Sequence, residues 1–163
     1  MDSFIFGYGT LIPKHYRENK IVAEIKGFKR IFHPGDDYGL WYPFVITKAD
    51  ATCRGLLIRD VDGTLLSATD TYEGYPELYD RIEVPVHVVH NAENSLDNAQ
   101  MPRKAWLYVP STKTASLTLD RIFKQMKKHD KNAYKEMMEK DLWLEKLQQE
   151  YPQLVEFFPA LFA

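Results

Sequence analysis

The stretch Phe4–Leu11 reads FIFGYGTL, a short apolar run that ends in two glycines placed on either side of a tyrosine. An apolar run that stops at turn residues is typical of a β-strand. Gly7 and Gly9 can adopt positive φ, and successive backbone N–H groups in such a turn converge on a carboxylate or an oxyanion. The spacing is not that of a P-loop or a dinucleotide fingerprint. Two interpretations therefore stay open here, a plain tight turn and a backbone-lined pocket for an anionic group.

The composition is that of an ordinary globular protein. The 163 residues carry 21 basic and 23 acidic side chains, a net charge of -2, and 45% of them are hydrophobic. A chain of this length typically forms one domain with a sizeable core. The balanced charge gives no reason to expect nucleic acid or a membrane surface as a partner. The single cysteine, Cys53, excludes an internal disulfide framework and a cysteine-rich zinc site.

The sequence also bears on localisation. Met1 and Asp2 lead straight into the first strand-like run, without the basic segment that opens a secretory signal peptide. No apolar stretch approaches the length that crosses a bilayer. We therefore expect a cytoplasmic protein.

Short β-rich runs alternate with turn residues up to about residue 110, which predicts a mixed sheet. One helix interrupts them, with Thr64 as its N-cap and Gly74 as its end, and Pro76 prevents its continuation. The predicted strands are Phe4–Phe6, Ile21–Ile25, Phe28–Phe32, Phe44–Thr47, Gly55–Arg59, Arg81–Val89 and Lys104–Val109.

The pattern becomes helical after residue 115. Apolar residues recur at helical spacing from Leu119 to Met126, and a second helix is predicted over about 132–150. The last residues, YPQLVEFFPALFA, are strongly apolar, so we expect them to enter the core or a dimer contact rather than form a lid. The predicted organisation is an α+β domain over residues 1–110 and a helical extension over 111–163 that packs on the same domain.

Glu73 is a candidate for proton transfer. It lies at the predicted C-terminal end of the short helix, where unpaired carbonyl groups make the potential negative. A carboxylate is disfavoured there, so its pKa is expected to rise, as suits a general acid or base. The alternative at this position is a solvated glutamate with no role.

The segment LLIRDVDGTLL, residues 56–66, resembles the first motif of the haloacid dehalogenase phosphohydrolases. That resemblance would make Asp60 a nucleophile and Asp62 an acid or base, beside Mg2+. Arg59 stands where that motif is normally apolar, the motif lies far from the N-terminus, and no clear acidic pair for Mg2+ follows. A turn that links a strand to a helix is the favoured interpretation.

The histidines do not indicate a metal site. His87 and His90 would point to opposite faces of one strand, so they cannot chelate a metal together. His15, His33 and His129 have no ligand partners nearby in the sequence. We expect neither a metal nor a cofactor.

Taken in order, three segments resemble the γ-glutamylcyclotransferase-like superfamily, and within it the γ-glutamylamine cyclotransferase and AIG2-like branch. They are FIFGYGTL, RGLLI in a middle strand, and TDTYEGYPELYDRIEV, over roughly residues 4–109. The family signature has Asp, Glu-Gly, Pro and Tyr-x-Arg, matched here by Asp70, Glu73, Gly74, Pro76, Tyr79 and Arg81.

The resemblance implies a small, nearly closed β-barrel-like sheet with short helices. It also implies an enzyme that cyclises a small γ-glutamyl amine or amino acid to 5-oxoproline and releases the amine. Glu73 would be the general acid/base, and no cofactor or metal would be required. The substrate's glutamyl part would be held through the loop of Tyr8, Gly9, Thr10 and Leu11, and Tyr79 would line the same cavity.

Two alternatives stay open beside this enzyme. One is a non-catalytic member of the same fold that binds a small acidic metabolite or a protein in the same cavity. The other is the Mg2+-dependent phosphohydrolase. A homodimer is possible under either interpretation of the apolar C-terminal end.

Overall fold

Six strands form a single curled sheet in the part of the chain described by the computed structural model, which comprises residues 3–35, 38–40, 42–91 and 101–163. The strand order is β4-β6-β1-β3-β2-β5, with β1 and β6 parallel and every other neighbouring pair antiparallel. The strands are β1 (Ser3–Gly7), β2 (Ile21–Ile31), β3 (Phe44–Asp60), β4 (Tyr79–Pro85), β5 (His87–Asn91) and β6 (Lys104–Pro110).

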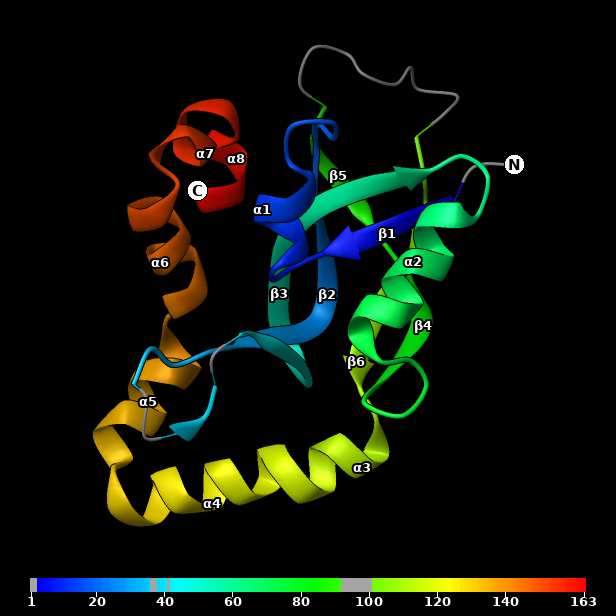
Figure 1. The fold of residues 1–163 in the computed structure, drawn as a ribbon. Helices are drawn as coiled ribbons and strands as arrows, with labels where there is room; N and C mark the ends of the chain where they lie inside the picture. Colours follow the sequence, from blue (N-terminus) through cyan, green and yellow to red (C-terminus); the bar gives the residue numbers. More distant parts are fainter. Residues whose placement is uncertain (1–2, 36–37, 41, 92–100) are drawn as a thin grey trace.

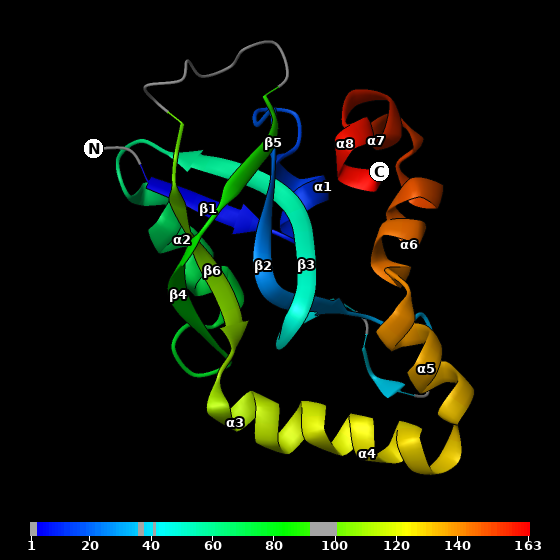
Figure 2. The same ribbon diagram turned by 180° about the vertical axis from the view of Figure 1, so that it is seen from behind.

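The sheet curls because two strands that are consecutive in the chain occupy its two opposite edges. β4 pairs with β6 and β5 pairs with β2, and only Val86 separates them. The Val86 N–H donates to the Arg103 carbonyl at 2.9 Å. The prediction of one continuous strand over 81–89 was therefore wrong, although its residues are extended. The result is the expected half-barrel, seen from opposite sides in Figures 1 and 2.

The long strands β2 and β3 each combine two of the predicted strands. In β2 the pairing register shifts between Lys26 and Phe28, where Gly27 has a φ of 85°. This bulge bends the strand without ending it. Lys26 pairs with Thr52 and Phe28 with Thr47, so the intervening residues of β3 lie outside the regular pairing. The polar residues near Asp50 looked like a connecting loop, but they lie inside one strand.

The helices lie outside the curl of the sheet, and those from α3 onward follow one end and one side of it (Figure 1). They are α1 (Leu11–His15), α2 (Thr64–Glu73), α3 (Thr112–Thr114), the π-helix η4 (Ala115–Leu119), α4 (Asp120–His129), α5 (Lys131–Glu139), α6 (Leu142–Glu150), α7 (Pro152–Phe157) and α8 (Pro159–Phe162). None of the described helices combines the length and apolar character that a membrane crossing needs.

The start of α2 explains the Asp-x-Asp-Gly-Thr segment. Asp60 is only 2% exposed, and its carboxylate accepts the N–H groups of Gly63, Leu65 and Leu66 at 3.0, 3.3 and 3.0 Å. Thr64 is the first helical residue and not the N-cap, a position that Gly63 holds with a φ of 85°. These N–H groups have no partner inside the helix, so the buried carboxylate replaces a conventional cap.

The segment 132–150, predicted as one helix, forms two helices, because the helical conformation is interrupted at Lys140 and Asp141. Lys140 has extended backbone angles, and the Asp141 side chain accepts the Leu144 N–H at 3.3 Å to begin α6. Helical periodicity continues through this point, so the sequence pattern alone gave no sign of the break.

The apolar C-terminal end packs into the core of the same chain. Phe158 and Leu154 are completely buried, and Leu161 is 1% exposed. They belong to a cluster, here called the extension core, that joins the first half of the chain to its end. Its buried members are Ile12, Tyr16, Val22, Phe32, Leu56, Leu142, Trp143, Leu147, Leu154, Phe158 and Leu161.

Candidate active site

A cavity of about 310 Å³ opens between the start of α1, the end of α2 and strands β4 and β6. The family resemblance assigned six residues to the site, at positions 8–11, 73 and 79, and all six line this cavity. Its lining residues are Phe6, Tyr8, Gly9, Thr10, Leu11, Tyr42, Pro43, Tyr72, Glu73, Leu78, Tyr79 and Tyr108.

Glu73 is the last residue of α2 and, among the described residues that line the cavity, the single charged one. Gly74 ends the helix with a φ of 73°, a conformation that costs glycine little. Burial raises the pKa of the Glu73 carboxyl to about 7, and the positive charge of Lys14 opposes this rise. The sequence argument predicted a raised pKa from the helix end, whereas burial in the cavity wall is the main cause.

Asp70, one turn before Glu73, attaches α2 to the sheet. The Tyr108 hydroxyl donates to its Oδ1 at 2.6 Å, and the Arg81 Nε lies 3.0 Å from the same oxygen. The Arg81 guanidinium also lies over the rings of Tyr75 and Trp106, at 4.8 and 4.7 Å from their centroids. The matched Asp and Arg of the signature therefore position the helix, and with it Glu73, rather than enter the cavity.

The glycines of the opening turn serve close packing. Positive φ occurs at Gly27, Gly39, Gly63 and Gly74 in the described part of the chain, so Gly7 and Gly9 do not use the positive φ that glycine can adopt. A Cβ on Gly9 would lie 2.7 Å from the Pro43 Cγ. A Cβ on Gly7 would lie 2.9 Å from the Ile58 Cδ1. At Gly9 the rigid Pro43 ring leaves no room for a side chain, whereas at Gly7 the neighbour is the end of the Ile58 side chain.

Helix α1 begins at the cavity wall without a side-chain cap. Thr10 occupies the N-cap position, but its Oγ1 lies 2.9 Å from the Tyr72 hydroxyl and not on a helix N–H. The Ile12 N–H donates to the Gly9 carbonyl at 3.1 Å. The N–H of Leu11, the first helical residue, has no partner within the helix.

Tyr8 is fixed from two directions. Its buried hydroxyl donates to the Tyr108 carbonyl at 2.7 Å, and burial raises the pKa of this hydroxyl well above its ordinary value. Its own carbonyl accepts a hydrogen bond from Arg30 Nη1 at 2.8 Å. The loop that lines the cavity is therefore held both by β6 and by the guanidinium of β2.

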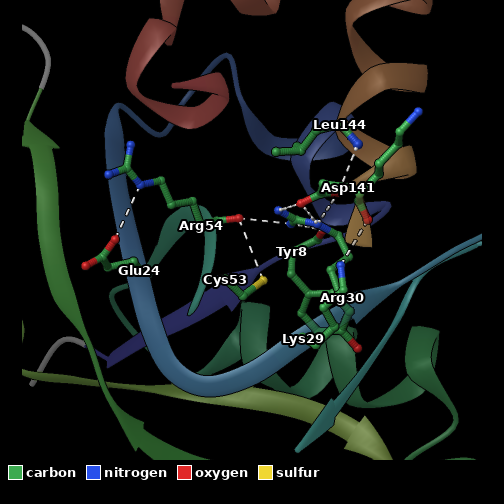
Figure 3. A network of polar contacts seen from close by, with 9 residues as sticks. Tyr8, Glu24, Lys29, Arg30, Cys53, Arg54, Asp141 and Leu144 are labelled. Atoms are coloured by element: carbon green, nitrogen blue, oxygen red, sulfur yellow. Dashed lines mark hydrogen bonds and ion pairs between the residues drawn. The ribbon is translucent and has the colours of Figure 1, made fainter. Parts of the chain in front are cut away.

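Arg30 connects this loop to the C-terminal helices (Figure 3). The Arg30 side chain lies in a residue that is only 3% exposed. Its Nη1 also donates to the Arg54 carbonyl at 2.9 Å. Its Nε and Nη2 donate to the Asp141 carboxylate at 3.1 and 2.9 Å. Full pairing is what allows a guanidinium to be buried. The start of α6 thereby contributes to the position of the Tyr8 carbonyl.

Tyr79 stacks on Phe44, with ring centroids 5.8 Å apart. Burial, and next the negative charge of Glu73, raise the pKa of its hydroxyl, so it stays protonated as a hydrogen-bond donor at neutral pH.

Sequence reasoning missed half of the cavity wall. Tyr42 and Pro43 reach it from the segment before β3, and Tyr108 reaches it from β6. None of them belongs to a recognisable motif, and Pro43 is brought there by its contact with Gly9. The strand predicted over Lys104–Val109 was the one signal available for Tyr108.

The phosphohydrolase interpretation does not fit this structure. The carboxylate of Asp60 is occupied by backbone N–H groups at the start of α2, so it is not free to act as a nucleophile. Within the described residues, no three His, Cys, Asp or Glu side chains come together as a metal ion would require.

Comparison with known proteins agrees with this fold. The family model for "Gamma-glutamyl cyclotransferase, AIG2-like" matches residues 5–129. Similar solved structures include an Arabidopsis thaliana protein at 21% identity and a TM-score of 0.50, covering 85% of this chain and 90% of that one. A gamma-glutamyl cyclotransferase is similar at 14% identity and a TM-score of 0.48, covering 86% and 89%.

An AIG2-like protein of Mus musculus is similar at 17% identity and a TM-score of 0.42, covering 69% and 78%. Among curated proteins no significant match was found. Since the family model spans well over half of the sequence, the chain belongs to the γ-glutamyl cyclotransferase, AIG2-like family.

Proposed function

We propose that the protein is a γ-glutamylcyclotransferase that converts a small γ-glutamyl amine or amino acid to 5-oxoproline and a free amine. The observation that carries the proposal is Glu73, a carboxyl with a pKa of about 7 in the wall of a cavity. A general acid/base works best when its pKa lies near the working pH. The carboxyl can therefore both accept and return a proton.

In the proposed reaction, Glu73 accepts a proton from the substrate's α-ammonium group. The freed amine attacks the γ-carbonyl carbon of the same substrate, and a new carbon–nitrogen bond closes the five-membered ring. The bond between the γ-carbon and the departing amine then breaks as Glu73 returns this proton to the amine. The ring nitrogen loses a second proton, which the released amine takes up to leave as an ammonium ion. The attack is intramolecular, so a folded conformation of the glutamyl chain supplies much of the rate acceleration.

The cavity wall has groups suited to the other charges of the substrate. We assign the backbone of Tyr8, Gly9, Thr10 and Leu11 to the glutamyl part, with the Leu11 N–H as a donor to an oxygen of the substrate. Tyr79 offers a protonated hydroxyl beside Glu73. Neither role needs a metal or a cofactor, and none is part of the proposal.

The test is a mass-spectrometric assay for 5-oxoproline, without added metal, on a panel of γ-glutamyl amines and amino acids. Wild-type protein is expected to form product, and Glu73→Gln is expected to lose at least 100-fold in rate, in the range typical of a general acid/base. Glu77→Gln is the matched control, because Glu77 is exposed, lies in the loop after the same helix and does not line the cavity.

Equal rates in wild type and Glu73→Gln would remove Glu73 from the mechanism. Product from no member of the panel would instead favour the binding role, in which the same cavity holds a small acidic metabolite without converting it.

A further inference from the structure

The mouth of the cavity differs from its interior. Phe6, Tyr8 and Tyr108 form buried walls, whereas Tyr42, Tyr72 and Leu78 are large apolar side chains that remain 52%, 50% and 58% exposed. These three residues, here called the rim, come from different parts of the chain: the segment before β3, helix α2 and the loop before β4. Exposed apolar residues gathered at a cavity entrance mark a binding surface more often than isolated ones do.

The rim is held in place on one side. The Tyr72 hydroxyl lies 2.9 Å from Thr10 Oγ1, and Lys14 Nζ lies 4.0 Å above the Tyr72 ring. Two contacts thus fix this exposed ring at the entrance. A ring fixed in advance gives up little conformational entropy when a ligand packs on it.

The charges near the cavity are few. Glu73 is the charged residue that lines it, and Lys14 is the cation whose field reaches the Glu73 carboxyl. A glutamyl group already brings one α-carboxylate that needs a donor or a cation. An amine half with a second carboxylate would need another cation, and the lining residues that the structure describes do not include one. A cationic amine half would meet Lys14 at the same entrance.

We propose that the rim of Tyr42, Tyr72 and Leu78 is the subsite for the departing amine, and that it selects substrates whose amine half is apolar. This inference rests on the proposed function. With the glutamyl half at Glu73, the amine half extends from the γ-carbonyl toward the entrance, where the rim contacts it and where the product leaves. An aliphatic or aromatic amine covers the exposed rings and the Leu78 side chain, and removes apolar surface from water.

The experiment compares four probes that share the γ-glutamyl half and differ in the amine: γ-glutamyl-benzylamide, γ-glutamyl-ethylamide, γ-glutamylglycine and the γ-glutamyl amide of 1,5-diaminopentane. We expect kcat/KM to be at least about 10-fold higher for the benzylamide than for each of the others, the scale of discrimination that apolar pockets reach. A preference for the acidic or the cationic probe, or equal values for all four, would overturn the inference.

Variants locate the preference at the rim. Leu78→Ser is expected to lower the benzylamide-to-glycine ratio of kcat/KM by about 5-fold or more. Leu117→Ser is the matched control, because Leu117 is 59% exposed, carries the same side chain and does not line the cavity. An unchanged ratio in Leu78→Ser and also in Tyr42→Ala would show that the preference arises elsewhere and would overturn the assignment.

Two further outcomes separate this inference from others. Product from all four probes without selectivity would leave the cyclotransferase standing and reject the rim alone, whereas product from none would reject the proposed function and the subsite with it. Sedimentation of wild type and Leu78→Ser tests whether a second copy of the chain covers the rim. A dimer that becomes a monomer in Leu78→Ser would assign the rim to self-association and overturn the inference.

Discussion

Glu73 decides the pH dependence of the proposed reaction. The cyclisation needs the carboxylate form to accept a proton, and burial places its pKa at about 7. We therefore expect kcat/KM to rise about 10-fold per pH unit below this pKa and to level off above it. Steady-state 5-oxoproline formation between pH 5 and 9 measures the profile. A flat profile, or one that breaks near the ordinary pKa of 4.5, would show that Glu73 is not the base.

The same rise in pKa means that the ionised Glu73 carboxylate destabilises the folded state at neutral pH. Its folded pKa lies above the unfolded value of 4.5, so the native chain binds more protons between these values. The free energy of unfolding therefore falls as pH rises from about 4.5 to about 7. Glu73→Gln removes this loss and should be more stable than wild type at pH 8 by on the order of 2 kcal/mol.

Urea unfolding of both proteins at pH 4.5 and pH 8 tests this expectation. The stability difference should shrink at the lower pH, where the wild-type carboxyl is protonated in the folded chain and about half protonated in the unfolded one. Glu77→Gln, an exposed control, should show no such pH-dependent difference. A Glu73→Gln variant that is less stable at pH 8 would mean that the carboxylate makes a stabilising contact.

Single residues also mark what the sequence could not reveal. Gly9 lines the cavity and Gly7 does not, and neither glycine has a positive φ. Their neighbours, Ile58 and Pro43, are brought to them by β3, and nothing local to FIFGYGTL encodes that contact. Glu73 could be identified from the sequence because a helix end and a family signature coincide there. Tyr42 and Tyr108 could not be identified, since they reach the cavity only through tertiary packing.

At the scale of elements, the start of α2 gives a prediction for Asp60. Removing its carboxylate leaves the N–H groups of Gly63, Leu65 and Leu66 without their acceptor. Asp60→Ala should lower the free energy of unfolding by about 1–3 kcal/mol, the usual cost of unsatisfied buried groups. Asp62→Ala, at an exposed position with a hydrogen bond to the Thr64 N–H, should cost less.

Thermal unfolding, 5-oxoproline assays and phosphate-release assays with and without Mg2+, each on both variants, complete this test. The folded Asp60→Ala protein should keep its activity, because Asp60 lies at the opposite end of α2 from Glu73. Loss of a Mg2+-dependent activity at unchanged stability would instead restore the phosphohydrolase interpretation.

The elements themselves were largely predictable, and their partners were not. Alternating apolar residues identified extended segments wherever they occur. The sequence did not predict that the strand ends at Val86, because apolar residues alternate through this position. The pairing partner nevertheless changes there from β6 to β2. Gly27 and the polar residues near Asp50 separate the predicted strands, yet β2 and β3 each continue through them. Pairing is a non-local property, and one sequence without its fold contains little information about it.

On the scale of the whole molecule, the extension core predicts that sheet and C-terminal helices unfold together. Leu154 is completely buried there among residues of α1, β2, β3 and α6. Leu154→Ala should cost about 2–5 kcal/mol, as large-to-small substitutions in well-packed cores do. Amide hydrogen exchange should show equal losses of protection in β2 and in α6, since both segments open in the same event.

Val155→Ala is the matched control, because Val155 is the next residue of α7 and is 38% exposed. It should change protection little. Loss of protection confined to α6–α8 would show that residues 111–163 unfold separately from the predicted domain of residues 1–110.

The bond between Arg30 and the Tyr8 carbonyl has a consequence for where the protein can be shortened. A chain truncated at residue 129, where the family match ends, would keep every side chain that lines the cavity. It would also lose Asp141, so the guanidinium that holds the cavity loop would be without its counter-charge. The smallest portable form of this cavity, whether for expression or for transfer into another scaffold, therefore extends at least through Asp141.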